Sequence, residues 1–211
     1  MLISMQFLLG VDEAGRAPLA GPVAVGVVAV ADGFDVAREF PGIKDSKQLS
    51  ELARERLFVE LQKRVERGDA RFRVSYGSHT EIDARGITIA VRRAVRRSVL
   101  ALVRECKNEV RPLGSGLKVE PRFRILLDGL LYAPREYPQE TVIHGDDLIP
   151  IISLASIAAK VSRDRLMRRL AKHYPAYGFE RHKGYATRAH YAALALHGPC
   201  AIHRMSYLHL D

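Results

Sequence analysis

Three carboxylate side chains follow apolar runs that lie far apart in the sequence. Asp12 and Glu13 come after residues 7–9, and Asp128 comes directly after residues 123–127. Each run is typical of a short buried strand, and the carboxyl ends of parallel strands meet at the ligand-binding edge of an α/β sheet. Acids gathered at one edge repel one another and favour a cation, so the pattern predicts a divalent-metal site. The alternative for Asp12 and Glu13 is a solvated turn.

A fourth carboxylate, Asp164, lies in a helical segment that is rich in small residues. Ser156, Lys160 and Asp164 are spaced four apart and therefore share one polar stripe of this helix. Asp164 is a candidate to join the three acids at the strand ends. The alternative is an ion pair with a neighbouring base, namely Lys160, Arg163 or Arg168.

A sheet must position these acids, and the sequence predicts five strands for it. Apolar or alternating runs place the strands at residues 6–12, 22–31, 71–76, 123–128 and 140–145. A short connection makes the first two strands antiparallel, whereas a long helix before the fourth makes that strand parallel to a neighbour. The first strand is the expected neighbour because it also ends in acids. The expected fold class is therefore α/β with a mixed sheet.

Periodicity and end signals predict helices around this sheet. Ser50 caps a helix that stops at Gly68, Thr80 begins a short helix, and Pro150 begins the helix that is rich in small residues. The small residues predict that this last helix packs closely. The longer helices are expected at residues 50–67, 87–106, 150–172 and 188–197.

The charge balance favours a polyanionic partner. The 211 residues include 33 Lys and Arg against 24 Asp and Glu, which gives a formal net charge of +9. A domain this basic indicates nucleic acid, and general solubility is the alternative explanation of the charge. Arg92, Arg93, Arg96 and Arg97 of one predicted helix are either a solvated face or a track for phosphates.

Composition also bears on location and assembly. Cys106 and Cys200 lack metal-type spacing, and two thiols fit a reducing cytoplasm better than a disulfide scaffold. No run approaches the roughly 20 apolar residues of a membrane span, and the first residues lack a signal-peptide pattern. We therefore expect a cytoplasmic monomer without membrane contact.

Several short motifs resemble ribonuclease HII and occur in that family's order. The pair Gly15-Arg16 resembles the loop of this family rather than that of the related ribonuclease HIII, which carries Lys. Together the motifs span about residues 7–207, nearly the whole chain. They are residues 10–16, 45–49, 128–129, 145–146, 155–164, 182–185 and 203–206.

The resemblance implies a ribonuclease H-like α/β fold, with a mixed five-stranded sheet flanked by helices. It implies a catalytic domain over residues 1–172 and a small helical, substrate-binding C-terminal subdomain over residues 173–211. The implied activity is a metal-dependent endoribonuclease of ribonucleotide excision repair. Such an enzyme cuts the RNA strand of RNA–DNA hybrids and nicks duplex DNA 5′ to embedded ribonucleotides, leaving 3′-hydroxyl and 5′-phosphate ends.

The motif match also implies which acids are catalytic and bind two divalent cations, Mg²⁺ or Mn²⁺: they are Asp12, Glu13, Asp128 and Asp164. Two such cations activate a water molecule and stabilise the leaving oxygen of a phosphodiester. Successive strand residues point to opposite faces, so Asp12 and Glu13 share a site only if the strand ends or bulges there.

The same match implies a set of residues that contact the nucleic acid. They are Gly15, Arg16, Ala17, Lys47, Lys183 and Tyr185, of which Lys47 and Lys183 either touch phosphate or are simply solvated. The family has Gly where this chain has Ala17, and Ala resists both a positive φ and close backbone approach. We therefore expect Ala17 to weaken the selectivity for single ribonucleotides more than it weakens the cleavage of longer RNA stretches.

Two other functions remain open at this point. One is a non-catalytic nucleic-acid-binding protein, which four intact acids argue against because a binder of phosphate gains nothing from carboxylates facing the backbone. The other is a different nuclease or a resolvase on the same fold, because fold does not fix chemistry. A need for the 2′-hydroxyl separates a ribonuclease from a resolvase.

Overall fold

A computed structural model of the chain describes residues 4–43, 48–109 and 120–208, and it is built on one five-stranded sheet. The sheet has the order β3-β2-β1-β4-β5. β2 pairs antiparallel with β1 and β3, and β4 pairs parallel with β1 and β5. The predicted mixed α/β fold is confirmed, as is the parallel pairing of the first and fourth strands. The strands are β1 (Ser4–Ala14), β2 (Val23–Ala31), β3 (Ala70–Gly77), β4 (Glu120–Asp128) and β5 (Gln139–Val142).

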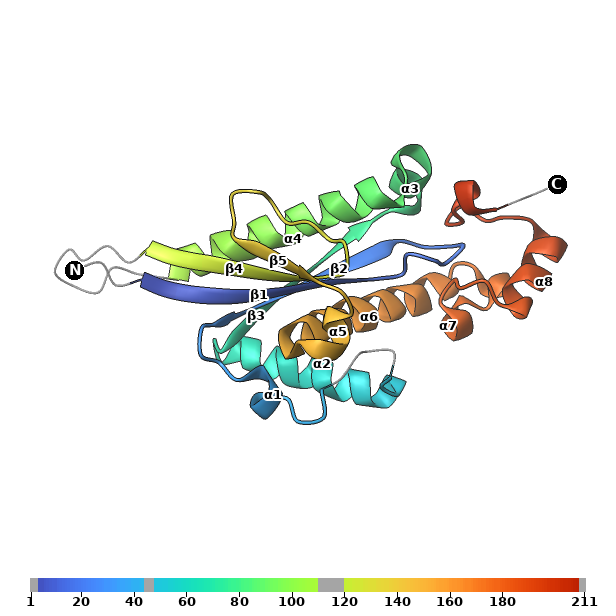
Figure 1. Ribbon diagram of the computed structural model, residues 1–211. Helices are drawn as coiled ribbons and strands as arrows, with labels where there is room; N and C mark the ends of the chain where they lie inside the picture. The colour runs from blue at the N-terminus through green and yellow to red at the C-terminus, as the bar shows by residue number, and fades with distance from the viewer. Residues whose placement is uncertain (1–3, 44–47, 110–119, 209–211) are drawn as a thin grey trace.

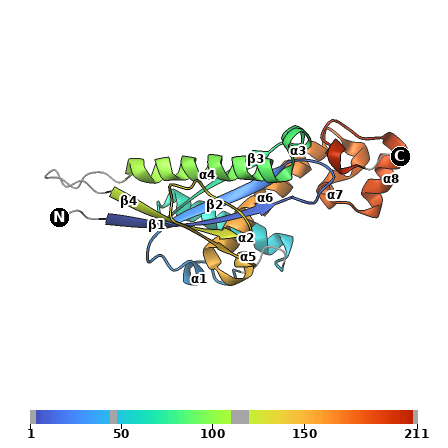
Figure 2. The same ribbon diagram turned by 45° about the horizontal axis from the view of Figure 1, so that its top comes forward.

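Helices cover both faces of the sheet. α4 packs over β2 and β3 on one face, and α6 packs over β1 and β2 on the other with α2 beside it (Figures 1 and 2). Within the described ranges, no helix is long and apolar enough to cross a membrane. The helices are α1 (Val36–Glu39), α2 (Glu51–Glu66), α3 (His79–Arg85), α4 (Ile87–Glu109), α5 (Gly145–Leu148), α6 (Pro150–Ala171), α7 (Phe179–His182) and α8 (Arg188–His197), with the 3₁₀ turns η1 (Pro175–Tyr177) and η2 (Met205–Tyr207).

Most helix ends follow the predicted signals, and one does not. Ser50 caps α2, and Pro150 occupies the first turn of α6. The predicted start of α3 at Thr80 is wrong, because Ser78 is the cap and its Oγ accepts the N–H of Glu81 at 3.0 Å. The sequence Ser-x-x-Glu, which begins at Ser78, satisfies the capping pattern two residues earlier than the alternative that begins at Thr80.

Three other boundaries differ from the prediction. α4 continues past Cys106 to the end of the described segment, and β4 already begins at residue 120. The edge strand expected at residues 140–145 ends at Val142. It stops there because His144 adopts a left-handed backbone, with φ of 56°, and α5 begins at the next residue.

Two glycines allow α6 to lie directly on the sheet. A Cβ on Gly10 would lie 2.3 Å from the carbonyl oxygen of Ile151, and a Cβ on Gly26 would lie 2.3 Å from the carbonyl oxygen of Ala155. Neither distance is possible between real atoms, so only glycine permits this separation. The predicted close packing of the small residues in this helix is confirmed, and it brings the polar stripe of α6 down to the level of the strand-end acids.

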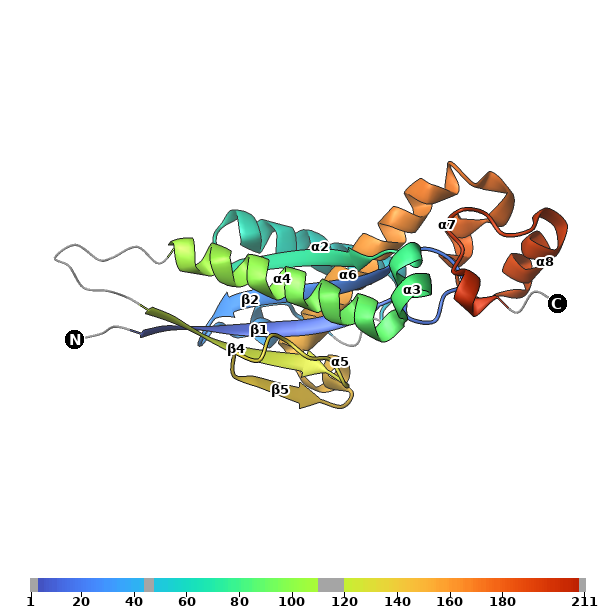
Figure 3. The same cartoon turned by 90° about the horizontal axis from the view of Figure 1, so that it is seen from above.

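The end of the chain forms an apolar cluster of its own beyond the sheet. This segment projects at the end of the molecule where β1 ends (Figure 3). The cluster also includes two residues of the 15–22 loop, the connection between β1 and β2, so the segment is joined to that loop. The division expected after residue 172 falls one residue beyond α6 and stays a prediction. The buried members are Leu19, Ala20, Met167, Ala171, Tyr177, Phe179, Leu194 and Ile202.

Candidate active site

The carboxyl ends of β1 and β4 bring two of the predicted acids side by side. Val11 pairs with Leu127 in the parallel ladder, so the next residues on the two strands, Asp12 and Asp128, lie at the same edge of the sheet. The two side chains are close enough for the charge of Asp128 to raise the pKa of Asp12. This edge is the one predicted from the two apolar runs.

α5 orients the carboxylate of Asp128. The backbone N–H groups of Gly145 and Asp146 donate to its Oδ1, over 2.7 and 3.4 Å. A Cβ on Gly145 would lie 2.7 Å from Cδ1 of Ile152, so a side chain there would push α5 away from the acid. The Gly145-Asp146 motif, which had no assigned role in the sequence, therefore positions a predicted site residue.

Asp12 and Glu13 lie on a strand that continues past both of them. The antiparallel register of β1 with β2 is unbroken from Asp12 to Ala14, so the expected strand end or bulge is absent. Asp12 is buried, accepts a hydrogen bond from Ser156 of α6, and also accepts the N–H of Glu13 at 2.7 Å. Glu13 accepts instead from Nη1 of Arg16, at 3.3 Å. The two acids are thus adjacent but have different side-chain partners.

Asp164 lies two helical turns beyond Ser156 on α6, roughly 12 Å along the axis. Its Oδ1 accepts from Nζ of Lys160 at 3.0 Å, and the Asp164 side chain is buried. The ion pair offered as the alternative is therefore present, although it is buried rather than on a surface. Lys160 also lies 5.3 Å from the centre of the Tyr185 ring, which links this acid to a predicted substrate-binding residue.

The electrostatics of the edge favour a cation. Burial raises the pKa of Asp12 well above its ordinary value of 3.8, and the charges of Glu13 and Asp128 raise it further, against the opposing hydrogen bond from Ser156. A nearby cation reverses this penalty, and carboxylate oxygens suit Mg²⁺ and Mn²⁺. The donor types therefore fit a divalent cation. As the side chains stand, no three His, Cys, Asp or Glu residues in the described part of the chain form a group that could hold one.

A fully buried arginine of α6 binds backbone carbonyl groups of the 15–22 loop. The guanidinium of Arg163 donates to the carbonyl oxygens of Pro22, Ala20 and Lys183, over 2.8, 3.2 and 3.1 Å. Burial lowers the pKa of Arg163, and several carbonyl dipoles compensate the charge. The sequence marked Arg163 only as a possible ion-pair partner, so this role was missed.

A second buried arginine comes from the other end of the chain. Arg204 donates from Nε to the carbonyl oxygen of Gly21, and from its two terminal nitrogens to the carbonyl oxygens of Arg16 and Gly15, over 2.9, 2.6 and 2.7 Å. Burial and the charge of Arg163 lower its pKa to about 10. Together the two guanidinium groups fix most of the loop's carbonyl groups in place.

Gly15 is required by this arrangement. Its φ is +90°, a region that side chains rarely adopt, and a Cβ would lie 2.0 Å from Nε of Arg163. Arg16 next to it keeps its side chain 47% exposed, so it is available to a ligand. Ala17 is exposed, and its φ is not positive. The backbone strain that Ala would suffer at a glycine-type position is therefore absent here.

The remaining predicted contact residues fall in different surroundings. Tyr185 is partly buried, with Arg163 5.6 Å and Lys160 5.3 Å from its ring centre. Lys183 is buried, and its ammonium donates to the carbonyl oxygens of Glu180 at 2.6 Å and Arg181 at 3.2 Å. Lys183 is therefore not simply solvated, and its contact with phosphate stays a prediction. The call on Lys47 lies outside the described residues.

The chain was then compared with known proteins. Residues 9–210 match the family described as Ribonuclease HII. The chain belongs to the ribonuclease HII family. It is 41% identical over 198 residues to the Ribonuclease HII of Acidovorax sp. strain JS42, covering 94% of this chain and 83% of that protein.

Solved structures agree with this assignment. The ribonuclease H2 of Pyrococcus horikoshii OT3 superimposes with a TM-score of 0.67 at 26% identity, covering 95% of this chain and 93% of that one. The RNase HII of Archaeoglobus fulgidus, solved in complex with PCNA, gives a TM-score of 0.64 at 25% identity over 97% and 96% of the two chains. As a member of the ribonuclease HII family, the protein is a hydrolytic endonuclease that acts on RNA–DNA hybrids.

Two hydrogen-bonded neutral histidines, His190 and His203, support Tyr185 in this ribonuclease HII family member, and we call them the histidine chain. Nδ1 of His190 donates to the carbonyl oxygen of Tyr185 at 2.9 Å, so its Nε2 accepts from Nε2 of His203 at 3.0 Å. Nδ1 of His203 then accepts the N–H of Cys200 at 2.8 Å. Each ring therefore donates once and accepts once, which is the pattern of a neutral imidazole.

This histidine chain predicts a loss of stability in acid. Burial lowers the pKa of His190, and it lowers the pKa of His203 from 6.5 to about 4. Between these values the unfolded chain binds more protons than the folded protein, so stability is full above about pH 6.5 and falls as the pH drops towards 4. For His203 the loss is on the order of 3 kcal/mol.

Urea unfolding at pH 7 and pH 4.5 measures this effect. We expect a His203→Gln variant to lose less stability between the two pH values than the unchanged protein. His173→Gln, at an exposed position, is the control and should behave like the unchanged protein. An identical pH dependence for His203→Gln would show that this histidine stays charged or exposed in the fold.

Proposed function

We propose that the protein nicks duplex DNA on the 5′ side of an embedded ribonucleotide and cuts the RNA strand of hybrids, leaving 3′-hydroxyl and 5′-phosphate ends. The observation that carries this proposal is the sheet edge where Asp12 and Asp128 lie together at the base of the 15–22 loop. The loop presents the exposed Arg16, which pairs with Glu13, the residue after Asp12 on β1. Hydrolysis at one particular phosphodiester needs acids that hold a cation at the bond and a basic group that binds the neighbouring nucleotide, and this edge and loop supply both kinds of group.

Asp12, Glu13, Asp128 and Asp164 are the proposed catalytic and metal-binding residues. Glu13 is kept in the set although β1 has no bulge between it and Asp12, because its charge still raises the pKa of Asp12. Two divalent cations, Mg²⁺ or Mn²⁺, would supply an activated water and stabilise the leaving 3′ oxygen. The protein's own part is positional: Ser156 and the N–H of Glu13 hold Asp12, and the start of α5 holds Asp128. Lys160 balances the charge of Asp164 until a cation does so.

Gly15, Arg16, Ala17 and Tyr185 are the proposed readers of the ribonucleotide. The 2′-hydroxyl both donates and accepts, so it is recognised by groups fixed on two sides of it. The loop is fixed by Arg163 and Arg204, and Tyr185 is fixed through its carbonyl by His190. Lys183 stays a proposed phosphate contact through the third N–H of its ammonium, since two carbonyl groups accept from the other two. Lys47 stays a prediction from the sequence.

We further propose a monomer in a reducing, cytoplasmic compartment. The free thiols of Cys106 and Cys200 are consistent with such a compartment. Residues 173–211 are proposed as a subdomain that helps to bind the substrate. Its apolar cluster includes Leu19 of the 15–22 loop, so its position and that of the reader residues are coupled.

The test is cleavage of four labelled duplexes with Mg²⁺ and with Mn²⁺. They are all-DNA, DNA with one ribonucleotide, DNA with several ribonucleotides, and an RNA–DNA hybrid. Metal-dependent nicking 5′ to the single ribonucleotide, with 3′-hydroxyl ends, is expected, and the all-DNA duplex should stay intact. Cleavage of the all-DNA duplex would show that no 2′-hydroxyl is needed and would point to another nuclease or a resolvase, and binding without cleavage would point to a non-catalytic binding protein.

The same substrates test the departure at Ala17. Because Ala17 is exposed and unstrained, the remaining effect of its Cβ is to hold the substrate backbone slightly away. We expect Ala17→Gly to raise cleavage at single ribonucleotides relative to longer RNA tracts, by roughly tenfold or less. The measurement is the ratio of the two kcat/KM values, and an unchanged ratio would contradict the idea.

A further inference from the structure

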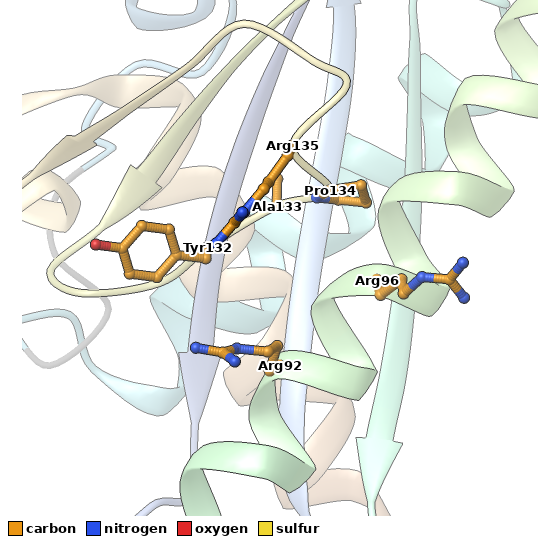
Figure 4. A pocket seen from close by; sticks show the side chains of 6 residues that line it. All are labelled: Arg92, Arg96, Tyr132, Ala133, Pro134 and Arg135. Carbon is orange, nitrogen blue, oxygen red and sulfur yellow. The ribbon is translucent and has the colours of Figure 1, made fainter.

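A groove leads away from the candidate active site along α4. Two adjoining pockets of about 140 and 460 Å³ share Arg92 and Tyr132 in their linings, so they form one continuous depression. Its inner end is lined by Arg16, and its outer end by Arg96 and Arg135. Figure 4 shows Arg92 and Arg96 on α4 and Tyr132 and Arg135 on the loop that follows β4, with Arg92 extending to the side of Tyr132 and Arg96 extending the other way in this view. We call this depression the arginine groove.

The arginines of α4 divide into two kinds. Arg93 pairs with Glu81 at 3.2 Å, and Arg97 donates to the carbonyl oxygen of Tyr76 at 2.7 Å. Arg92 and Arg96 line the groove and have no hydrogen bond or ion pair with any residue that the structure describes. The structure therefore separates Arg92 and Arg96, which line the groove, from Arg93 and Arg97, which have protein partners, and a phosphate contact of the first pair stays a prediction.

All the charged residues that line the groove are basic, and they lie among apolar and neutral residues. Four arginines contribute to its walls, and none of the described residues that line either pocket is acidic. Four guanidinium groups held along one depression repel one another, and a polyanion relieves that repulsion. Arginine also offers a planar set of donors that matches a phosphate group in two places.

The wall of the groove opposite α4 is a loop that the core and a side-chain hydrogen bond hold in place. Leu131 and Ala133 are buried in the main core, which anchors the loop on both sides of Tyr132. The side chain of Gln139 accepts the N–H of Ala133 at 2.9 Å and donates to nearby carbonyl groups. Tyr132 is left 59% exposed, with its ring beside the groove. Such a ring provides a surface for a sugar or a base.

We propose that the arginine groove binds the sugar–phosphate backbone of the duplex that flanks the cleaved bond. The groove begins at Arg16, so a strand read there at its ribonucleotide continues along Arg92 and Arg96. This inference rests on the proposed function, because it assumes that Arg16 contacts the ribonucleotide. It adds a binding surface outside the acidic edge, where the contacts are to phosphates and carry no sequence preference.

The test compares two variants with the same change of charge. Arg92→Ala/Arg96→Ala removes the groove pair, and Arg93→Ala/Arg97→Ala removes the neighbouring pair on the same helix. Binding to a labelled duplex with one ribonucleotide is measured in EDTA at several salt concentrations, and kcat and KM are measured with metal. Thermal unfolding checks that both variants are folded.

The groove variant should reduce the slope of log K against log salt by about 2, at about 0.9 for each lost phosphate contact. Its KM should rise roughly tenfold with an unchanged kcat, whereas the control pair should change neither strongly. Arg92→Lys/Arg96→Lys should restore much of the binding. The effect should vanish on duplexes shortened on the side that reaches the groove, and persist on those shortened on the other side.

Equal effects in both variants, or an effect that does not depend on the length of either flank, would overturn the proposal. Failure of the proposed function is separate and is seen in the unchanged protein. If that protein binds the duplex in EDTA but never cuts at the ribonucleotide, the proposed activity is wrong. The salt slopes of the variants still decide whether the groove binds the backbone.

Discussion

Replacing Asp12 with Asn is expected to lower kcat by about 10³-fold and, in the absence of metal, to stabilise the fold. The loss of activity follows because the buried carboxylate is the central proposed ligand of a cation, and about 4 kcal/mol of transition-state stabilisation corresponds to 10³-fold. The gain in stability follows from the raised pKa of Asp12. A group whose pKa is raised in the fold contributes stability at low pH that is lost as the pH rises. At pH 7 the neutral amide avoids that penalty.

Bound metal is expected to make the unchanged protein more stable than Asp12→Asn, which reverses the order expected in EDTA. A cation that binds the folded protein stabilises it in proportion to the logarithm of its concentration over its Kd. We therefore expect added Mg²⁺ or Mn²⁺ to raise the Tm of the unchanged protein more than that of Asp12→Asn. Thermal unfolding in EDTA and in a metal series measures both effects.

Asp147→Asn is the matched control for this experiment. Asp147 is an exposed acid of α5 that accepts from Gln48 at 2.6 Å, so its replacement makes the same chemical change outside the acidic edge. The control should keep full activity and respond to metal like the unchanged protein. Asp12→Asn with a lower Tm in EDTA would contradict the electrostatic account, and near-normal cleavage by it would remove Asp12 from the catalytic set.

Replacing Arg163 with Met is expected to lower the free energy of unfolding by about 2–4 kcal/mol. Three carbonyl groups lose a charged donor, among them those of Ala20 and Pro22. Part of this loss is offset, because Met also removes the cost of burying a guanidinium. Arg165→Met is the control on the same helix, since Arg165 pairs with Glu55 near the surface and should lose less than about 1 kcal/mol.

Urea unfolding of both variants measures the difference, and the substrate series measures its effect on recognition. Because Arg163 supports the loop and not the acids, we expect KM to rise at single ribonucleotides more than kcat falls. Equal stability losses for Arg163→Met and Arg165→Met would show that the buried hydrogen bonds contribute little. A fall in kcat alone would place Arg163 closer to the chemistry than its contacts indicate.

The sheet and its acidic edge could be predicted from local sequence because both depend on short-range patterns. The apolar runs before Asp12 and Asp128 indicate strands, and the long helix between strands indicates the parallel pairing that brings their ends together. Element ends were less certain wherever two neighbouring residues satisfied the same signal. Ser78 and Thr80 both offer a capping hydroxyl, and the choice is made by the chain's entry into the helix.

The support of the 15–22 loop could not be predicted in this way. An arginine in a basic sequence is most often a surface charge, and nothing local distinguishes Arg163 from Arg165 or Arg168. What buries Arg163 is its packing against a loop formed 141 residues earlier. The same holds for Lys183, whose left-handed backbone, with φ of 53°, accompanies a turn of its ammonium towards carbonyl groups. These contacts depend on tertiary structure that no short window contains.

The hydrogen bonds from Arg204 to Gly15 and Arg16 also bear on the order in which the fold is completed. These contacts join residues 189 and 188 positions apart, so on a ribosome the loop is made long before the side chain that secures it. A nascent chain therefore carries both strand-end acids well before Arg204 reaches the 15–22 loop. The carbonyl groups of Gly15 and Arg16 lack this donor until Arg204 has left the exit tunnel. The loop that we propose as the reader of the ribonucleotide is thus secured late, after the strands that carry Asp12 and Asp128 have been made.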